Sequence, residues 1–295
     1  MQYSKHIAIG CLLATAGAVV GGLGTPIAKA LLTEGSASPM SLTMLRIAGT
    51  ALVFWTLPSG RQHVKLRHLG LMLLIGTLGI APQMFLFNYG LHLSFPIEVS
   101  IISSCSALWV VILDTITRQI ARARYLRRGT LFTIIGMMVT IFFFGEEKHN
   151  FRHISGNGIA MASMLVGGLC TATTSRLPGH YNTATIYKWI YTFALVPEVI
   201  YYSISDNTPT LHILGIEQAM EIIYVCIITG AASIILHSQA LRRISPKTGD
   251  ICSFAQPFAA MIVAYNIGFD TLTWFDPIAI VIIFISYLIA TVKRV

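Results

Sequence analysis

Long apolar segments recur along the whole chain, and they restrict the fold more than any other feature. A helix needs about 20 mostly apolar residues to cross the hydrocarbon of a bilayer. The 295-residue sequence is 55% hydrophobic and only 11% charged, and its mean hydropathy is +0.71. These values lie well outside the range of soluble proteins. The sequence therefore predicts an all-α membrane protein that spans the lipid bilayer several times.

We predict ten transmembrane helices, five in each half of the chain. Short loops separate them, and several loops contain residues that break helices, such as Pro58-Ser59-Gly60. The first half, 7–145, holds spans at about 7–29, 40–57, 69–91, 97–117 and 129–145. The second half, 157–292, holds spans at about 157–176, 183–203, 219–239, 249–267 and 274–292.

The loop charges test this span count and predict the orientation. If the N-terminus is cytoplasmic, 15 of the 20 Lys and Arg residues fall in inside segments and 2 in outside loops. The other three, Lys29, Arg46 and Lys188, fall within spans. Such a bias is typical of a cytoplasmic (inner) membrane protein with both termini inside. It also accounts for most of the net charge of +8 without a nucleic-acid partner.

The two halves share sequence. Val20-Gly21-Gly22-Leu23-Gly24-Thr25 returns with one change at Val166-Gly167-Gly168-Leu169-Cys170-Thr171, 146 residues later. A second match has a spacing of 150 and aligns Leu91, Pro96, Ile101 and Ser103 with Leu241, Pro246, Ile251 and Ser253. Because each half has an odd number of spans, the second must begin on the opposite side of the membrane. The prediction is two inverted five-helix repeats.

With these features the chain resembles the drug/metabolite transporter superfamily, specifically its ten-span proteins with two EamA domains. The resemblance covers about 7–145 and 157–292 and is carried by short motifs. They include Gly24-Thr25-Pro26-Ile27-Ala28-Lys29, Leu45-Arg46 with Ala48, Tyr89-Gly90-Leu91 before Ser94-Phe95-Pro96, Ala240-Leu241-Arg242-Arg243-Ile244-Ser245, and Pro257. The chain departs from the family at Ser106-Ala107, where a proline is common, and at Thr117-Arg118 and Gly268-Phe269-Asp270, where a Glu-Arg pair is common.

The resemblance implies a secondary transporter, usually an exporter, of a small metabolite such as an amino acid or related compound. Alternating access between the repeats would move the substrate, with or without a coupling ion. We find no catalytic constellation, so a membrane-embedded enzyme is disfavoured, as are a channel and a non-transporting membrane protein. The resemblance implies no cofactor. The substrate, the coupling ion and the oligomeric state stay open.

Charged residues at membrane depth are costly and mark the first candidates for a substrate site. Arg46 lies about 4 Å from the predicted midplane, at a rise of 1.5 Å per residue. Glu198 lies at similar depth in the equivalent span of the second half. The two either pair with each other or compete for an ionic substrate. A fixed structural ion pair and a snorkelling Arg46 are the alternatives.

Other polar and aromatic residues complete the candidate site. Lys188 and Trp189 form either an inner gate or an ordinary interfacial pair of a snorkelling lysine and a belt tryptophan. Uncharged hydrogen-bonding groups near the repeat cores are Gln83, Asn88, Tyr89, His237, Gln239 and Gln256. Each of these could instead form a bond between helices.

We expect no metal site and no disulfide framework. The five cysteines lie in apolar runs without a short CxxC spacing, and they are expected to pack as small residues. His149 and His153 have the spacing of a helical metal pair but fall in a predicted polar loop. The repeated glycines are expected to bring helices close together rather than to bind a substrate.

Overall fold

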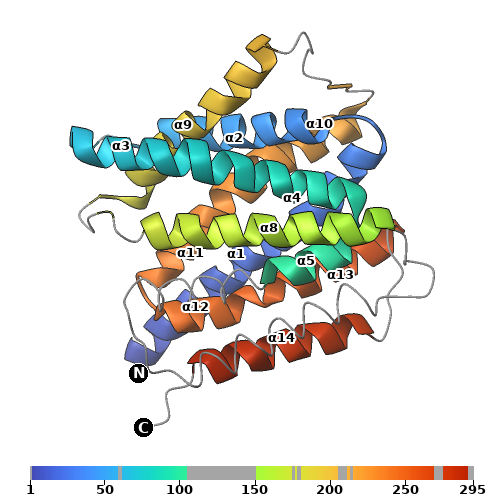
Figure 1. Ribbon diagram of the computed structural model, residues 1–295. Coiled ribbons are helices and arrows are strands. Elements are labelled where there is room, and N and C mark those ends of the chain that lie inside the picture. Colours follow the sequence, from blue (N-terminus) through green and yellow to red (C-terminus); the bar gives the residue numbers. More distant parts are fainter. Residues whose placement is uncertain are drawn as a thin grey trace.

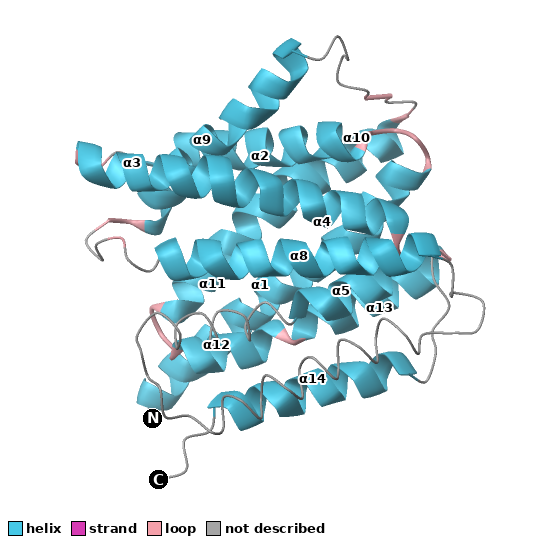
Figure 2. Cartoon of the chain, viewed as in Figure 1, coloured by secondary structure: helices cyan, strands magenta, loops and turns pink. Residues whose placement is uncertain are grey.

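The structure, a computed structural model, is a bundle of helices (Figures 1 and 2). It describes residues 2–58, 62–104, 151–174, 177, 181–204, 211–212, 215–268 and 275–291. Outside the helices, the described residues form one isolated bridge, between Ala37 and Leu211. The helices are α1 (Gln2–Thr33), α2 (Pro39–Thr56), α3 (Leu66–Ile75), η2 (Gly76–Ile80), α4 (Ala81–Leu93), α5 (Pro96–Ser104), α8 (Phe151–Thr174), α9 (Thr183–Ile204), α10 (Ile216–Ile223), η4 (Tyr224–Ala232), α11 (Ser233–Leu241), α12 (Pro246–Ser253), α13 (Ala255–Ile267) and α14 (Phe275–Thr291).

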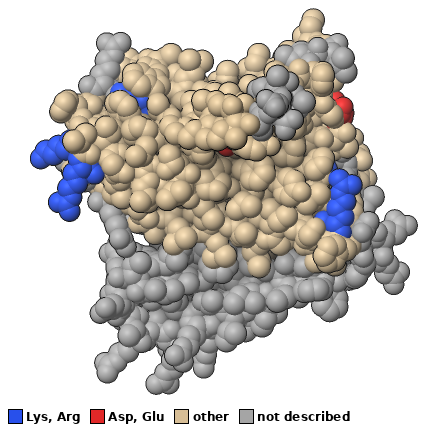
Figure 3. Space-filling view, turned by 45° about the horizontal axis from the view of Figure 1, so that its top comes forward, with Lys and Arg blue, Asp and Glu red and all other residues tan. Residues whose placement is uncertain are grey.

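Helices occupy the predicted spans wherever the structure describes them. The predicted span 97–117 is described as far as Ser104, and 129–145 lies outside the described residues. Four continuous helical stretches in the described part are long and apolar enough to cross a membrane: His6–Thr33, Leu66–Leu93, Phe151–Thr174 and Ile216–Leu241. Figure 3 shows a face on which most visible charged side chains lie near the two ends, with an uncharged belt between them. The fold is that of a multi-pass membrane protein.

Two π-helices interrupt the long helices at equivalent places. In η2 the N–H of Ala81 bonds to the carbonyl of Gly76, five residues back, so the turn holds one residue more than an α-turn. At a spacing of 150, residues 76–80 correspond to 226–230, which lie inside η4. Pro82 lacks an N–H and would favour such a turn in the first half, but Ala232 stands at the equivalent position in the second. Proline therefore explains only one of them.

Each π-helix approaches a helix from the other half of the chain. A Cβ on Gly76 of η2 would overlap the carbonyl oxygen of Ile190 on α9. A Cβ on Gly49 of α2 would lie 2.6 Å from the carbonyl oxygen of Cys226 on η4. Glycine at one of the two contacting positions therefore lets the backbones come together at both places.

The predicted span 249–267 is two helices rather than one. α12 ends at Ser253 and α13 begins at Ala255, with Phe254 between them at φ −65° and ψ −9°. Pro257 has no N–H to donate to the carbonyl of Ser253, four residues earlier, so the α-helical bond at the break is lost. The start of α12 is fixed by Ser245, whose hydroxyl accepts the Thr248 N–H at 3.3 Å.

α1 packs along η4 and α11, and α8 packs in the same way along η2 and α4. Gly10 faces Ile244, Gly17 faces His237 and Gly24 faces Thr229, so α1 runs antiparallel to the stretch it contacts. In the other half Gly156 faces Leu93, Gly90 faces Ala160 and Gly79 faces Cys170. In the view of Figure 1, α2 and α9 lie on one side of these stretches and α14 lies on the other.

Candidate functional site

Arg46 on α2 lies where helices of both halves meet. Its Nη1 donates to Oδ1 of Asn88 on α4 at 2.8 Å, and its guanidinium lies 5.7 Å from the centre of the Phe87 ring. Tyr191 on α9 and Cys226 on η4 lie close to it. Two helices from each half therefore contribute to its surroundings.

A chain of hydrogen bonds holds the Arg46 side chain in place. Asn88, which is fully buried, donates its Nδ2 to the Thr43 hydroxyl at 2.8 Å. Thr43 in turn donates to the carbonyl of Pro39 at 2.7 Å. The Nε of Arg46 is buried and has no hydrogen-bond partner among the described residues. A buried donor without a partner is costly, so this N–H is suited to an acceptor that arrives from outside.

Glu198 on α9 is almost completely buried, at 2% exposure. Its Oε2 has no hydrogen-bond partner within the described part of the chain. Among the described residues it forms no ion pair with Arg46, whose Nη1 bonds to Asn88. Arg46 Nε and Glu198 Oε2 are therefore both buried without a hydrogen-bond partner among the described residues.

Lys188 and Trp189 lie together on α9, and Trp55 from the end of α2 joins them. The Lys188 ammonium lies 4.5 Å from the centre of the Trp55 ring and 5.1 Å from that of Trp189. Trp55 also donates its indole N–H to the Thr192 hydroxyl at 2.9 Å. These contacts are cation–π interactions. They form a separate cluster, toward the opposite end of α2 from the Arg46 network.

The uncharged candidates are dispersed among other contacts. Gln83 covers Gly167 on α8, where its Nε2 would lie 3.3 Å from an added Cβ. Gln256 donates to the Ser103 hydroxyl on α5 at 3.3 Å. His237 lies beside Gly249 on α12. Tyr89 is 38% exposed and stacks on Phe85.

Gln239 lines a pocket of about 270 Å³ where α2 ends and α9 begins. Phe54, Asn182, Ser238 and Arg242 line the same pocket. Polar groups from α9 and α11 therefore converge on a partly apolar hollow. This combination is typical of a small-molecule site.

At the other end of the bundle, hydrogen bonds join the helices. Lys29 donates from Nζ to the carbonyls of Leu91 and His92, both at 2.9 Å, in the last turn of α4. A cation there satisfies free carbonyls and complements the helix dipole. The buried Glu98 accepts hydrogen bonds from Asn157 at 2.6 Å and from Ser94 at 3.1 Å. These bonds hold α1, α4, α5 and α8 together at this end.

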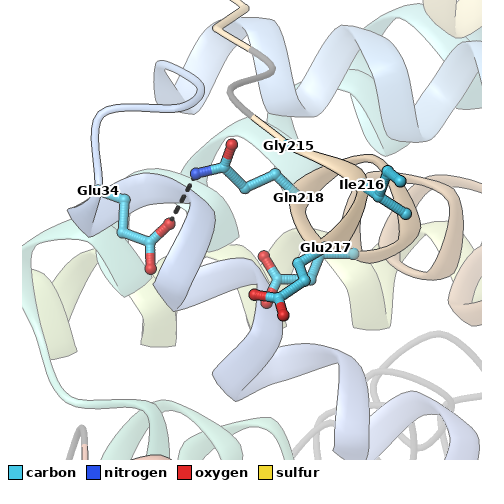
Figure 4. Close-up of a pocket in the computed structure, with 6 residues that line it drawn as sticks. Glu34, Gly215, Ile216, Glu217 and Gln218 are labelled. Carbon is cyan, nitrogen blue, oxygen red and sulfur yellow. Dashed lines mark hydrogen bonds between the residues drawn. The ribbon is translucent and has the colours of Figure 1, made fainter.

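A second hollow of about 430 Å³ lies at this same end, between α1 and the start of α10. Glu34, Glu217 and Glu221 line it, and Gln218 donates to Glu34 at 3.3 Å, as Figure 4 shows. Among the described residues, no group of three His, Cys, Asp or Glu side chains could hold a metal ion. His149, which with His153 has the spacing of a helical metal pair, lies outside the described residues.

Sequence reasoning named Arg46 and Asn88 but not the other members of their network. Thr43 stands three residues before Arg46 and so shares its helix face, a signal the sequence does contain. The sequence carries no such signal for Tyr191 and Cys226, because they lie on helices that are far from α2 along the chain. Trp55 likewise could be linked to Lys188 only through the packing of α2 on α9.

A family model described as the EamA-like transporter family matches twice, over residues 8–146 and 154–292. No curated protein matches the chain. One solved structure, titled only "Crystal structure of protein", is similar with a TM-score of 0.63 and 16% sequence identity. The similarity covers 96% of this chain and 95% of that chain, and at this identity it concerns the fold alone.

Proposed function

Since the chain belongs to the EamA-like transporter family, we propose that it is a secondary transporter of a small polar metabolite that carries a carboxylate. The observation that carries this proposal is the buried Nε of Arg46, which lacks a partner while Nη1 is held by Asn88. A guanidinium fixed in this way offers a directed donor and a positive charge to a carboxylate. An amino acid or related compound has the required group.

The membrane arrangement that we propose is ten spans in two inverted repeats, with both termini in the cytoplasm of a cell-membrane protein. The loop charges favour this orientation. The antiparallel contacts of α1 with α11 and of α8 with α4, at matching positions, support the inversion. Substrate would be exported by alternating access around a site between the repeats.

In this orientation the end with the Lys29 and Glu98 hydrogen bonds faces outward, and the pocket lined by Arg242 faces the cytoplasm. Hydrogen bonds join the helices at both ends, through Lys29 and Glu98 at the outer end and from Asn182 and Thr185 to the Gln62 side chain at the inner end. A hollow also lies at each end. Alternating access would open one of these ends at a time.

Counterflow in liposomes tests the proposed function. Purified protein should exchange a labelled carboxylate-bearing metabolite in a saturable way, and a panel of amino acids is the first set of substrates to try. Arg46→Ala should lower kcat/KM by on the order of ten- to a hundredfold, because a hydrogen bond to a charged group is removed. Arg243→Ala is the matched control and should transport normally.

Unsaturable flux would indicate a channel, and no flux with any substrate would reject the transporter. Normal transport by a folded Arg46→Ala variant would remove Arg46 from the site. Thermal unfolding in detergent shows whether each variant is folded.

We also propose that Glu198 carries the coupling proton. It is buried, and its Oε2 is unpartnered among the described residues, so protonation would relieve the cost of burying its charge. Glu198→Gln should abolish stimulation of uptake by an imposed pH gradient and keep counterflow, which needs no net proton movement. A variant that still responds to the gradient would exclude Glu198, and wild-type protein without any response would exclude proton coupling.

A further inference from the structure

The pocket at the inner end of α2 is separated from Arg46 by three aromatic rings. Phe54 lines the pocket and is itself fully buried. Its ring stacks on Tyr187 at 5.9 Å between centroids and lies 6.5 Å from Tyr191. The two tyrosine rings are 6.2 Å apart. The three rings, here called the aromatic plug, fill the interface between α2 and α9.

The inner face of the aromatic plug meets the pocket, and its outer face meets the Arg46 network. Tyr191 is 5% exposed and lies close to Arg46. Phe54 lies two helical turns beyond Arg46 on α2, a distance of about 12 Å at 1.5 Å per residue. A solute that moved along the α2–α9 interface from the pocket would therefore meet the plug before it met Arg46.

The pocket has the chemistry to receive an anionic metabolite. Arg242 lines it with an exposed side chain, and no hydrogen bond of that side chain is found within the described ranges. Asn182, Ser238 and Gln239 add hydrogen-bonding groups. The neighbouring Arg243 differs, because its Nη1 bonds to the carbonyl of Gln239 at 3.0 Å. At about 270 Å³ the pocket lies just below the roughly 300–1,000 Å³ of drug-sized sites, so it suits a small solute.

We propose that this pocket is the cytoplasmic entrance for a small carboxylate-bearing metabolite and that the aromatic plug of Phe54, Tyr187 and Tyr191 is the gate between it and Arg46. The inference rests on the proposed function and orientation. Small rotations of α2 against α9 would separate the rings and connect the pocket with the Arg46 network. Arg242 draws the anion in, and Arg46 takes it over once the plug parts.

Cys226 provides a native probe on the far side of the plug, because it is 4% exposed and lies close to Arg46. The experiment keeps Cys226 as the single cysteine, with Cys11, Cys105, Cys170 and Cys252 replaced by alanine. Everted and right-side-out membrane vesicles are treated with an anionic methanethiosulfonate, the 2-sulfonatoethyl derivative, or a cationic one, the 2-trimethylammonioethyl derivative. The rate of Cys226 modification is measured from each side.

Phe54→Ala should speed modification from the cytoplasmic side several-fold and leave the rate from the outside unchanged. Phe193→Ala is the matched control, because that ring stacks on Trp189 outside the plug. Phe54→Leu, which keeps an apolar side chain, serves if Phe54→Ala does not fold. An unchanged rate in a folded Phe54 variant, or an equal increase with Phe193→Ala, would overturn the gate.

Arg242→Gln should lower the ratio of anionic to cationic modification rates by about tenfold, because local charge concentrates ions of opposite sign. Arg243→Gln should leave the ratio unchanged, and equal ratios in both variants would overturn the role of Arg242. The labelling reaction needs no transport substrate. Phe54-dependent labelling combined with a failed counterflow screen would therefore reject the proposed substrate and keep the gate, whereas the reverse result would reject the gate alone.

Discussion

Gly21 and Gly167 hold the same position in the two copies of one motif, but their surroundings differ. An added Cβ on Gly167 would contact the Gln83 side chain, whereas one on Gly21 would meet no heavy atom within 4 Å. The residue equivalent to Gln83, at the spacing of 150, is Ser233. The Ser233 hydroxyl turns back to bond to carbonyls of its own helix. The open space at Gly21 therefore comes from the shorter side chain opposite it.

The neighbouring contacts keep the same spacing but exchange their residues. Gly79 against Cys170 in one half corresponds to Thr229 against Gly24 in the other. In the first pair the glycine lies on the π-helix η2, and in the second it lies on α1, the helix that packs against η4. Both pairs keep the close contact. At Gly21 and Ser233 both partners are small and no close contact forms, whereas the small pair Gly90 and Ala160 is tightly packed. The contacts of a substrate do not have to be the same in the two halves. We therefore interpret the space beside Gly21 as the place where the bundle interior leaves more room for a substrate than the equivalent place beside Gly167.

The largest effect is expected when the gap is filled. Ser233→Gln should place a side chain over Gly21, as Gln83 covers Gly167, and lower kcat/KM in the counterflow assay by about ten- to two-hundredfold, the range for a steric misfit of about one methylene. Ser233→Ala is the control, since it removes the hydroxyl without filling the space, and it should transport nearly normally. Wild-type transport by a folded Ser233→Gln variant would show that the gap has no part in transport.

A smaller effect separates Gly21 from the adjacent Gly22. A Cβ on Gly22 would overlap the carbonyl oxygen of Gln256, so Gly22→Ala should lower the free energy of unfolding by about 1–3 kcal/mol. Gly21→Ala should raise it by up to about 1 kcal/mol, because alanine favours the helix and nothing obstructs it. Unfolding in detergent measures both. Changes of the same sign would mean that the two glycines have equivalent surroundings.

The sequence was sufficient to predict a helical membrane protein, the repeated halves and the family. Those features depend on hydropathy and turn residues, which are local. Span 249–267 shows the limit, because the sequence contains Pro257 but does not locate the break at Phe254. The position of a break depends on which carbonyl loses its donor and on how the two segments pack.

The site was predicted as a set of residues but not as contacts. Arg46 and Glu198 were matched by depth, yet Arg46 bonds to Asn88. Depth does not specify the direction in which a side chain points around the helix axis. The extra residue in η2 adds to the problem, because it changes the direction around the helix axis of the side chains that follow it. The aromatic plug was missed for the same reason, because its rings come from two helices that contact each other only in the fold.

The two π-helices also carry information about the history of the chain. The spacing between the halves is 150 at the helix starts before them, Leu66 and Ile216, and again 150 at the starts after them, Pro96 and Pro246. An extra residue gained by one copy alone would have changed that spacing between the two points. The matching spacing is what duplication of a half-length unit that already contained the wide turn would leave.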